Sequence, residues 1–220
     1  MTIFKTIVLG LLAILMTSCF EMIEDVTVHK DGSGHVKLIL NASQSKTDIN
    51  ALLIVKEVNG YRIPTIPEFK SKLSLLMDSI KRSPGFSNVK YSFDDQNFIL
   101  VFEADFDKIE RLNDGIYQLW HKHDPINAKP ESYYGFSNNQ FYRQPGQLFN
   151  ALYAKMKPGD RTVLQGATYT MLFRFSQNIL SKKNDATKIS NNKKVVFLKL
   201  PLQLMLEKPS YWFNIIELQP

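Results

Sequence analysis

The four histidines of this 220-residue chain form two pairs that could hold a transition metal. The pairs are His29 with His35 and His121 with His123. The expected strand register places the first pair on facing positions, with Glu24 or Asp31 nearby. Imidazole nitrogens bind zinc well, but neither pair has a recognisable third protein ligand at a diagnostic spacing. We therefore interpret all four as exposed strand or loop histidines and expect no bound metal.

Five carboxylates gather around a hairpin predicted over residues 89–104: Asp94, Asp95, Glu103, Asp105 and Asp107. Two carboxylates can hydrolyse a glycosidic bond when they face each other across a cleft at about 5–9.5 Å. We interpret this group instead as a solvated face plus one helix cap. The chain shows no phosphate-binding loop, catalytic triad or zinc signature. We predict a protein without enzymatic activity or cofactor, and keep a glycan hydrolase with a carboxylate pair as the alternative.

Aromatic residues are concentrated in one short stretch, which contains Tyr133, Tyr134, Phe136, Phe141 and Tyr142. Such a patch could line a lipid-binding cavity or dock at a membrane interface, where amphipathic rings prefer to sit. Aromatic side chains also fill the core of many sheets. A core role is the favoured interpretation, and these five residues are kept as ligand-binding candidates.

The first eighteen residues have the pattern of a secretory signal peptide, with Lys5 before an uncharged apolar run from Ile7 to Met16. The run is too short for a membrane-spanning helix, which needs about 20 apolar residues. It ends at Met16-Thr17-Ser18-Cys19, which contains the only cysteine of the chain. This segment resembles the lipobox of bacterial lipoproteins. The resemblance implies a diacylglycerol on Cys19, cleavage before it, and, with Phe20 next, sorting to the outer membrane.

Alternating residues predict the elements that begin the mature chain. Residues 20–29 and 36–41 form a hairpin around the turn from Lys30 to Gly34, and pairing Val28 with Val36 keeps apolar residues on one face. A helix follows over residues 65–83, where Thr65 and Glu68 match a capping box. The segment 45–58 fits a short helix or a buried strand. A second helix is expected from Asp107, its predicted cap.

The second half is less regular. It is predicted to contain an aromatic hairpin (131–143), a helix (145–157), a strand (169–175), a polar loop (181–194), a strand interrupted by Pro201 (195–206) and a last strand (211–218). Hairpins followed by helices, without strict βαβ alternation, favour an α+β fold. We expect an antiparallel sheet built from hairpins, with two or three amphipathic helices packed on one face. Residues 19–220 would form one domain.

Charge is distributed unevenly along the mature chain. Residues 19–142 carry 14 basic and 17 acidic side chains, whereas residues 143–220 carry 12 and 4. A basic face could meet anionic lipid headgroups. The favoured interpretation is that the lysines between Ser181 and Lys194 solvate a long loop. Nucleic acid is not expected as a partner of a lipidated envelope protein.

Several of these segments together resemble the LppM-type bacterial lipoproteins. They are Cys19 followed at once by a strand, the Lys30-Asp31-Gly32-Ser33-Gly34 turn, the helix and hairpin after it, and a turn before an apolar strand over residues 189–196. The resemblance implies an α+β lipoprotein domain capable of binding an envelope lipid or glycolipid. It implies no catalytic residue.

The sequence therefore predicts a membrane-anchored lipoprotein of the cell envelope, tethered through Cys19, that acts as a lipid- or glycolipid-binding or assembly module. A purely structural or partner-binding lipoprotein is a further alternative. Only about three residues separate Cys19 from patterned strand, and an extended chain covers about 3.3–3.6 Å per residue. The first strand should thus begin within roughly 10–15 Å of the anchor, which holds the domain close to the bilayer.

Overall fold

A seven-stranded sheet organises the computed structural model, which describes residues 20–58, 61–123, 129–146, 151, 153–156, 161 and 164–220. Its strands are β1 (Glu21–Val28), β2 (Gly34–Asn41), β5 (Phe86–Asp94), β6 (Ile99–Phe106), β9 (Thr168–Phe175), β11 (Lys188–Ile189) and β12 (Val195–Pro201). Their order across the sheet is β11-β12-β9-β1-β2-β6-β5. All neighbours are antiparallel except β1 and β9, which run parallel.

A second, four-stranded sheet and the helices complete the fold. The sheet contains β7 (Tyr134–Ser137), β8 (Gln140–Arg143), β10 (Ile179–Lys182) and β13 (Asn214–Leu218), in the order β10-β13-β8-β7. The helices are α2 (Lys46–Val55), α3 (Ile66–Lys81), α4 (Arg111–His123) and α6 (Leu202–Glu207), and a short hairpin joins β3 (Glu57–Val58) to β4 (Tyr61–Arg62). The mixed α+β class with a mostly antiparallel sheet is confirmed.

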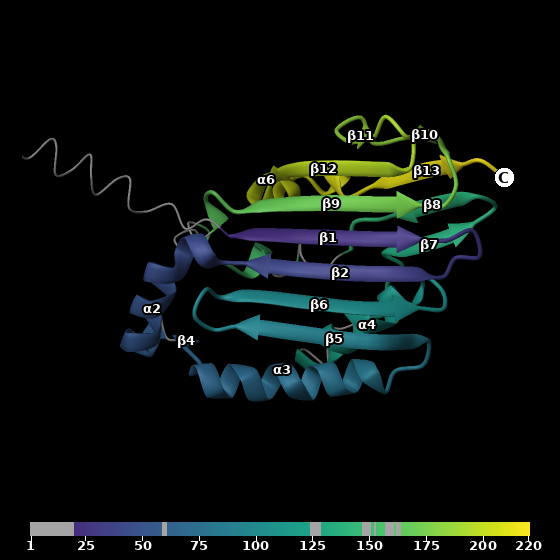
Figure 1. Ribbon diagram of the computed structural model, residues 1–220. Helices are drawn as coiled ribbons and strands as arrows, with labels where there is room; N and C mark the ends of the chain where they lie inside the picture. Colours follow the sequence, from purple (N-terminus) through teal and green to yellow (C-terminus); the bar gives the residue numbers. More distant parts are fainter. Residues whose placement is uncertain are drawn as a thin grey trace, which may run out of the picture.

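The large sheet has an inner face that the rest of the chain covers. Even-numbered residues of β1, β2 and β6 lie opposite each other, and those of β1 lie opposite odd-numbered residues of β9, so the apolar side chains of the four strands form one continuous surface. Figure 1 shows the second sheet and α4 behind this sheet, and α3 along its β5 edge. Phe141 of β8 packs its ring against Phe173 and Phe175 of β9, and the core therefore lies between the two sheets.

The outer face is polar and carries cross-strand ion pairs. Lys199 contacts Glu21 at 2.7 Å, Arg174 contacts Asp25 at 2.8 Å, and Lys37 contacts Glu103 at 2.6 Å. Exposed pairs of this kind stabilise a protein by at most about 1 kcal/mol each. Their main consequence is that this face stays in solvent.

The expected pairing of the first hairpin is wrong by two residues. Val36 lies opposite Val26, and Val28 lies opposite Gly34, because the turn closes tightly when the His29 amide donates to the Ser33 carbonyl. A Cβ at position 34 would overlap the Thr27 carbonyl, and this close approach requires glycine. The apolar residues keep their face, since a shift by two preserves parity.

Other boundaries also differ from expectation. The segment 45–58 forms α2 and then β3, and the strand through Pro201 ends at that proline, where α6 begins. The polar loop contains the end of β10 and all of β11. The helix expected over 145–157 falls partly outside the described residues.

The start of α3 confirms the predicted capping box. The Glu68 amide donates to the Thr65 hydroxyl oxygen, and the Glu68 carboxylate accepts the Thr65 amide at 2.8 Å. The same carboxylate accepts a bond from Arg62 at 2.6 Å. The Arg62 guanidinium, followed by the Thr65 donors, lowers the pKa of Glu68 to about 2.

We expect Glu68 to make folding stability depend on acid. A carboxyl whose pKa falls on folding stabilises the native state above its unfolded pKa of about 4.5, and that contribution is lost as the pH falls towards about 2. Glu68→Gln should therefore show a smaller loss of unfolding free energy over this range than the unaltered protein. Urea unfolding at a series of pH values measures it. Asp78→Asn, in the same helix but outside the cap, is the control, and an equal effect of both changes would contradict the prediction.

Candidate functional site

Three of the five aromatic candidates lie in the core. Tyr133, Tyr134 and Phe141 are buried between the two sheets, whereas Phe136 and Tyr142 are partly exposed. The predicted aromatic hairpin is present as β7 and β8. Its buried rings therefore pack between the sheets. Tyr134 also belongs to a cluster of buried polar side chains.

Glu24 is a buried carboxylate on the inner face of β1. Its Oε1 accepts a 2.5 Å hydrogen bond from the Tyr134 hydroxyl, and its Oε2 accepts one from the Tyr169 hydroxyl. Arg143 of β8, also buried, places its Nε 3.5 Å from the same Oε1. An ion pair and two phenols therefore meet at the interface of the two sheets.

Aromatic rings surround the Arg143 guanidinium. Its Cζ lies 4.6 Å from the centre of the Tyr134 ring and 5.2 Å from that of Trp212, and one Nη donates to the Gln144 carbonyl. Rings at this distance attract a cation through their quadrupole. Burial raises the pKa of Tyr134 well above its usual value, so its phenol stays protonated and donates to Glu24.

Sequence reasoning missed this cluster although a signal for it was present. Glu24 occupies an even position between Met22 and Val26, on the face that alternation predicts to be apolar. A charged residue at an inward position implies a buried partner of opposite charge. From the sequence alone, Glu24 was considered only as a metal ligand beside the first histidine pair, and Arg143 was assigned no role.

An apolar groove lies beside the cluster, between the inner face of the large sheet and helices α3 and α4. It has a volume of about 290 Å³. Sheet residues on its wall include Met22, Val36, Leu38, Leu40, Leu100 and Phe102. Helix residues include Leu73, Leu76, Met77, Ile80, Leu112 and Ile116. Tyr134 closes one side, and its hydroxyl is already bound to Glu24, which leaves the groove lining almost wholly apolar.

The groove opens at one end of the sheet. Along the inner face of β2, Val36 is 2% exposed, whereas Leu38 is 41% and Leu40 is 37% exposed. The open part is the end at which β1 begins, because Met22 pairs with Leu40. Large apolar side chains are seldom left open to solvent as a group unless the surface binds something.

One helical glycine helps to keep the groove empty. Gly115 of α4 lines it, and a Cβ added there would meet the Phe86 ring at 3.5 Å, an ordinary contact distance. Alanine would therefore fit, and a larger side chain would extend into the groove. Glycine in a helix interior destabilises the protein by roughly 0.5–1 kcal/mol relative to alanine. Its presence in α4 keeps the groove open at the expense of helix stability.

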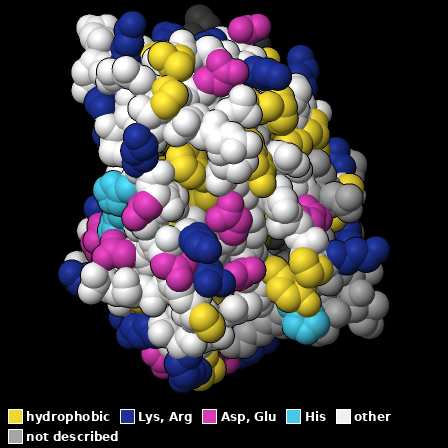
Figure 2. Space-filling view, turned by 90° about the vertical axis from the view of Figure 1, so that its right-hand side faces the viewer, with side chains coloured by type: hydrophobic (Ala, Val, Ile, Leu, Met, Phe, Trp, Pro, Cys, Tyr) yellow, Lys and Arg dark blue, Asp and Glu magenta, His cyan; other side chains and the backbone are white. Residues whose placement is uncertain are grey.

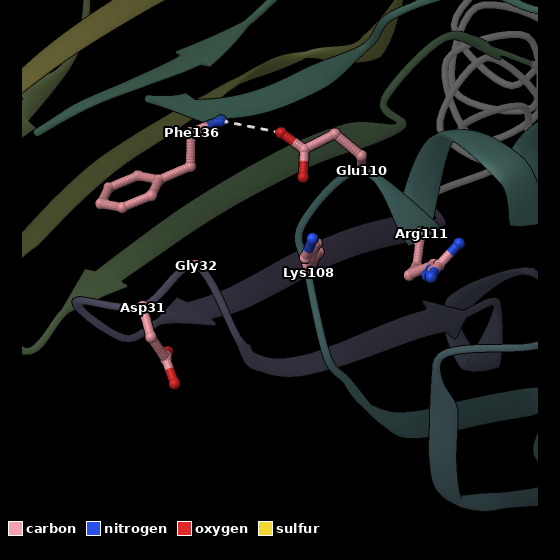
Figure 3. Close-up of a pocket in the computed structure, with 6 residues that line it drawn as sticks. All are labelled: Asp31, Gly32, Lys108, Glu110, Arg111 and Phe136. Carbon is pink, nitrogen blue, oxygen red and sulfur yellow. Dashed lines mark hydrogen bonds between the residues drawn. The ribbon is translucent and has the colours of Figure 1, made fainter. Parts of the chain in front are cut away.

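A second, polar cavity of about 510 Å³ lies at the opposite end, beside the β1–β2 turn. Figure 3 shows its lining, with Asp31 turned away from Glu110. The Asp31 carboxylate accepts bonds from Ser33 within its own turn, and Glu110 accepts the Phe136 amide at 3.2 Å. These two carboxylates therefore do not form a facing pair.

The predicted acidic group is distributed over separate contacts. Asp105 accepts a hydrogen bond from Asn88 at 2.6 Å and contacts His35 at 2.7 Å, and the Asn88 bond, followed by the His35 bond, lowers the pKa of Asp105. Of the others, Glu103 pairs with Lys37, Asp95 with Lys70 and Asp107 with Arg111, while Asp94 accepts the Gln96 and Asn97 amides. Asp107 does not cap α4, which begins at Arg111. This arrangement adds no support for the glycan-hydrolase alternative.

The histidine pairs take different places from those expected. His35 lies opposite Thr27, not His29, because of the register difference, and it contacts Asp105 instead. His121 is exposed and stacks near Tyr117, and the side chain of His123 lies outside the described part of the chain. Among the described residues, no three His, Cys, Asp or Glu side chains form a group that could hold a metal. Cys19 also lies outside the described residues.

Two lysines of the basic segment bind main-chain carbonyls. Lys182 donates to the Asn184 carbonyl at 2.9 Å, and Lys194 donates to that of Ser176. Lys188 lies over the Phe197 ring. These side chains stabilise the turns around β10 and β11, within the segment that the sequence predicts to be a solvated loop.

Loss of one partner of the Glu24–Arg143 pair should destabilise the protein much more than loss of one partner of a surface pair on the same strand. Removing one partner of a buried pair costs about 3–5 kcal/mol, because the other charge stays buried and unpaired. We therefore expect Glu24→Gln to lower the unfolding free energy by about that amount, and Glu24→Leu with Arg143→Met to cost less than the two single changes together. Urea unfolding measures each variant.

Glu21→Gln is the matched control for this prediction. Glu21 lies on the same strand and pairs with Lys199 on the solvent face, so its loss should cost less than about 1 kcal/mol. Equal losses of unfolding free energy in Glu21→Gln and Glu24→Gln would contradict the prediction.

A scan against protein-family models finds no match for this chain, and a search of curated proteins finds none. Among solved structures, the chain is similar to the NMR structure of the folded domain of LppM from Mycobacterium tuberculosis. The two are 13% identical, the match covers 91% of each chain, and the TM-score is 0.37. A likeness of this degree establishes neither family membership nor function.

Proposed function

We propose that this protein is a membrane-anchored lipoprotein of the cell envelope that binds one acyl chain of a lipid or glycolipid in the groove between β2, α3 and α4. The observation that carries the proposal is the apolar groove, whose sheet wall remains open at Leu38 and Leu40. Anchoring would occur through Cys19, as the lipobox-like segment before it suggests.

The size of the groove favours part of one chain. Its volume of about 290 Å³ is at the lower end of ligand sites. This is roughly ten times the volume of about 30 Å³ that one water molecule occupies in the liquid. A methylene group is of similar size, and each one buried contributes about 0.8 kcal/mol, so about ten would contribute roughly 8 kcal/mol before the costs of association. The headgroup would remain outside, at the mouth.

The position of the mouth suits a ligand that comes from a membrane. Met22 lines the groove and lies three residues after Cys19, a distance of about 10 Å in an extended chain. Acylation of Cys19 would therefore hold the mouth near the bilayer surface. A chain could pass from the bilayer into the groove without a long path through water.

Charge in the groove wall should abolish lipid binding. We expect Leu38→Glu to reduce retained lipid at least tenfold, because it removes an apolar contact of about 1.5–3 kcal/mol and introduces a charge into the groove. Gly115→Leu should reduce it as well, by filling the groove without charge. Native mass spectrometry of the full chain, extracted from its own membrane, measures the fraction that carries lipid.

Phe197→Glu is the control for this experiment. Phe197 is about as exposed as Leu38 but lies on β12, outside the groove lining. It should leave the lipid-bound fraction unchanged. Retention of lipid in both groove variants would refute binding in the groove.

We expect metabolic labelling with palmitate to depend on Cys19. The unaltered chain should incorporate label into the membrane fraction, and Cys19→Ala should not, because the thiol is the acceptor of the diacylglycerol in the lipobox pattern. Detection by gel fluorography is sufficient, with the amount of chain checked by immunoblot. Equal labelling of the two chains would exclude lipidation at this residue.

A further inference from the structure

Helix α2 exposes apolar side chains that the fold leaves uncovered. None of its ten residues is buried. Ile54 is 78% exposed and Val55 is 61% exposed, and Leu52 is exposed beside them. We call Leu52, Ile54 and Val55 the apolar tip of α2. All three lie in the last turn of the helix, and Leu52 and Val55 are neighbours three residues apart. Large apolar side chains exposed together are typical of an interaction site.

The apolar tip is held in place at both ends of the helix. Before α2, the Ala42 amide donates to the Phe98 carbonyl and the Ser43 amide to the Asn41 side chain, which fixes the start to the end of β2. After α2, Lys56 adopts a left-handed conformation with φ of 64°, and its amide donates to the Leu52 carbonyl. This is a helix C-terminal cap. The exposure therefore belongs to an ordered element.

The tip, the groove mouth and the start of the domain lie at one end of the sheet. Glu21, the first residue of β1, pairs with Asn41, which leads into α2, and Leu40 lies at the open end of the groove. Figure 1 shows α2 at the end where β1 begins. The opposite end, seen in Figure 2, carries acidic and basic side chains of mixed sign with apolar side chains among them.

We infer that α2 is a membrane-insertion element, whose apolar tip enters the interfacial layer of a lipid bilayer beside the groove mouth. β1 begins two residues after Cys19, so an acyl group on Cys19 would attach the domain to the bilayer at this end. The inference deepens the proposed function, from which it takes the membrane as the surface next to this end. No helix of the described residues is long and apolar enough to span a bilayer, and α2, about 15 Å long, would lie within one leaflet.

The ends of α2 fit this position. Lys46 is its first residue and Lys56 caps its last turn, so a cationic side chain lies at each end while the apolar tip occupies the final turn. Lysine stems can extend along apolar surface and leave the ammonium group at the headgroups. Insertion would add an attachment through the protein itself beside the acyl anchor.

A fluorescent probe at the tip tests the inference. Ile54→Cys is labelled with an environment-sensitive fluorophore in the full chain, which is then reconstituted in phosphatidylcholine–phosphatidylglycerol vesicles containing nitroxide-labelled lipid. Leu180→Cys is the matched control, since Leu180 is 61% exposed and lies on β10, away from α2. The unaltered chain, labelled in parallel, measures any signal from Cys19. Both positions are exposed, and neither change should disturb the core.

We expect the lipid-borne nitroxide to quench the probe at position 54 several-fold more than the probe at position 180. Equal quenching at the two positions would overturn the inference. So would a probe at position 54 that is shielded without lipid in a chain of doubled mass, because a second copy would then cover the tip.

The quenching and mass-spectrometry experiments together separate this inference from the proposed function. If position 54 is quenched while the unaltered chain retains no lipid in native mass spectrometry, the groove proposal fails and insertion of α2 stands. If lipid is retained and lost in Leu38→Glu while position 54 is not quenched, the groove proposal stands and insertion fails.

Discussion

The buried ion pair between Glu24 and Arg143 fixes how the two sheets of this protein meet. Glu24 belongs to the large sheet and Arg143 to the small one, and each is accessible to almost no solvent. Neither charge tolerates burial alone, so the sheets are stable only in the arrangement that brings the two groups together. Tyr134 and Tyr169 complete the coordination of the carboxylate, one from each sheet. The remaining structure is arranged around this contact.

The groove follows from where the small sheet stops. That sheet covers the inner face over β1, β9 and β12, and Tyr134 stands at its border with a hydroxyl on Glu24 and a ring on the groove wall. Beyond it, α3 and α4 cover β2 and β6 incompletely, and Leu38 and Leu40 remain open. The polar cluster and the apolar groove are thus neighbours on one face, with the phenol separating them.

The sequence predicts the elements of this fold better than their pairing. Alternation and the Thr65–Glu68 capping box identify the hairpins and α3, because these signals are local. Parity assigns the right face to Val26 and Val36, but it does not determine how many residues form the turn. The predicted pairing of His29 with His35 was therefore wrong. Arg143 and Glu24 are far apart in the chain, and nothing local pairs them. The groove results from incomplete packing of the helices on the sheet. Alternation predicts which face Leu38 occupies, but it does not predict that Leu38 stays exposed there.

The first strand of the domain occupies the middle of its largest sheet. β1 pairs on one side with β2, which follows it directly, and on the other with β9, so that Arg174 and Asp25 meet from positions 149 residues apart. Such distant contacts form late, since the chain between them must first be brought together. A chain exported from its N-terminus would present the β9 edge of β1 long before β9 arrives. In such a chain, assembly of the sheet would be completed only after almost the whole polypeptide had been translocated, and acylation of Cys19 would place that step at the membrane surface.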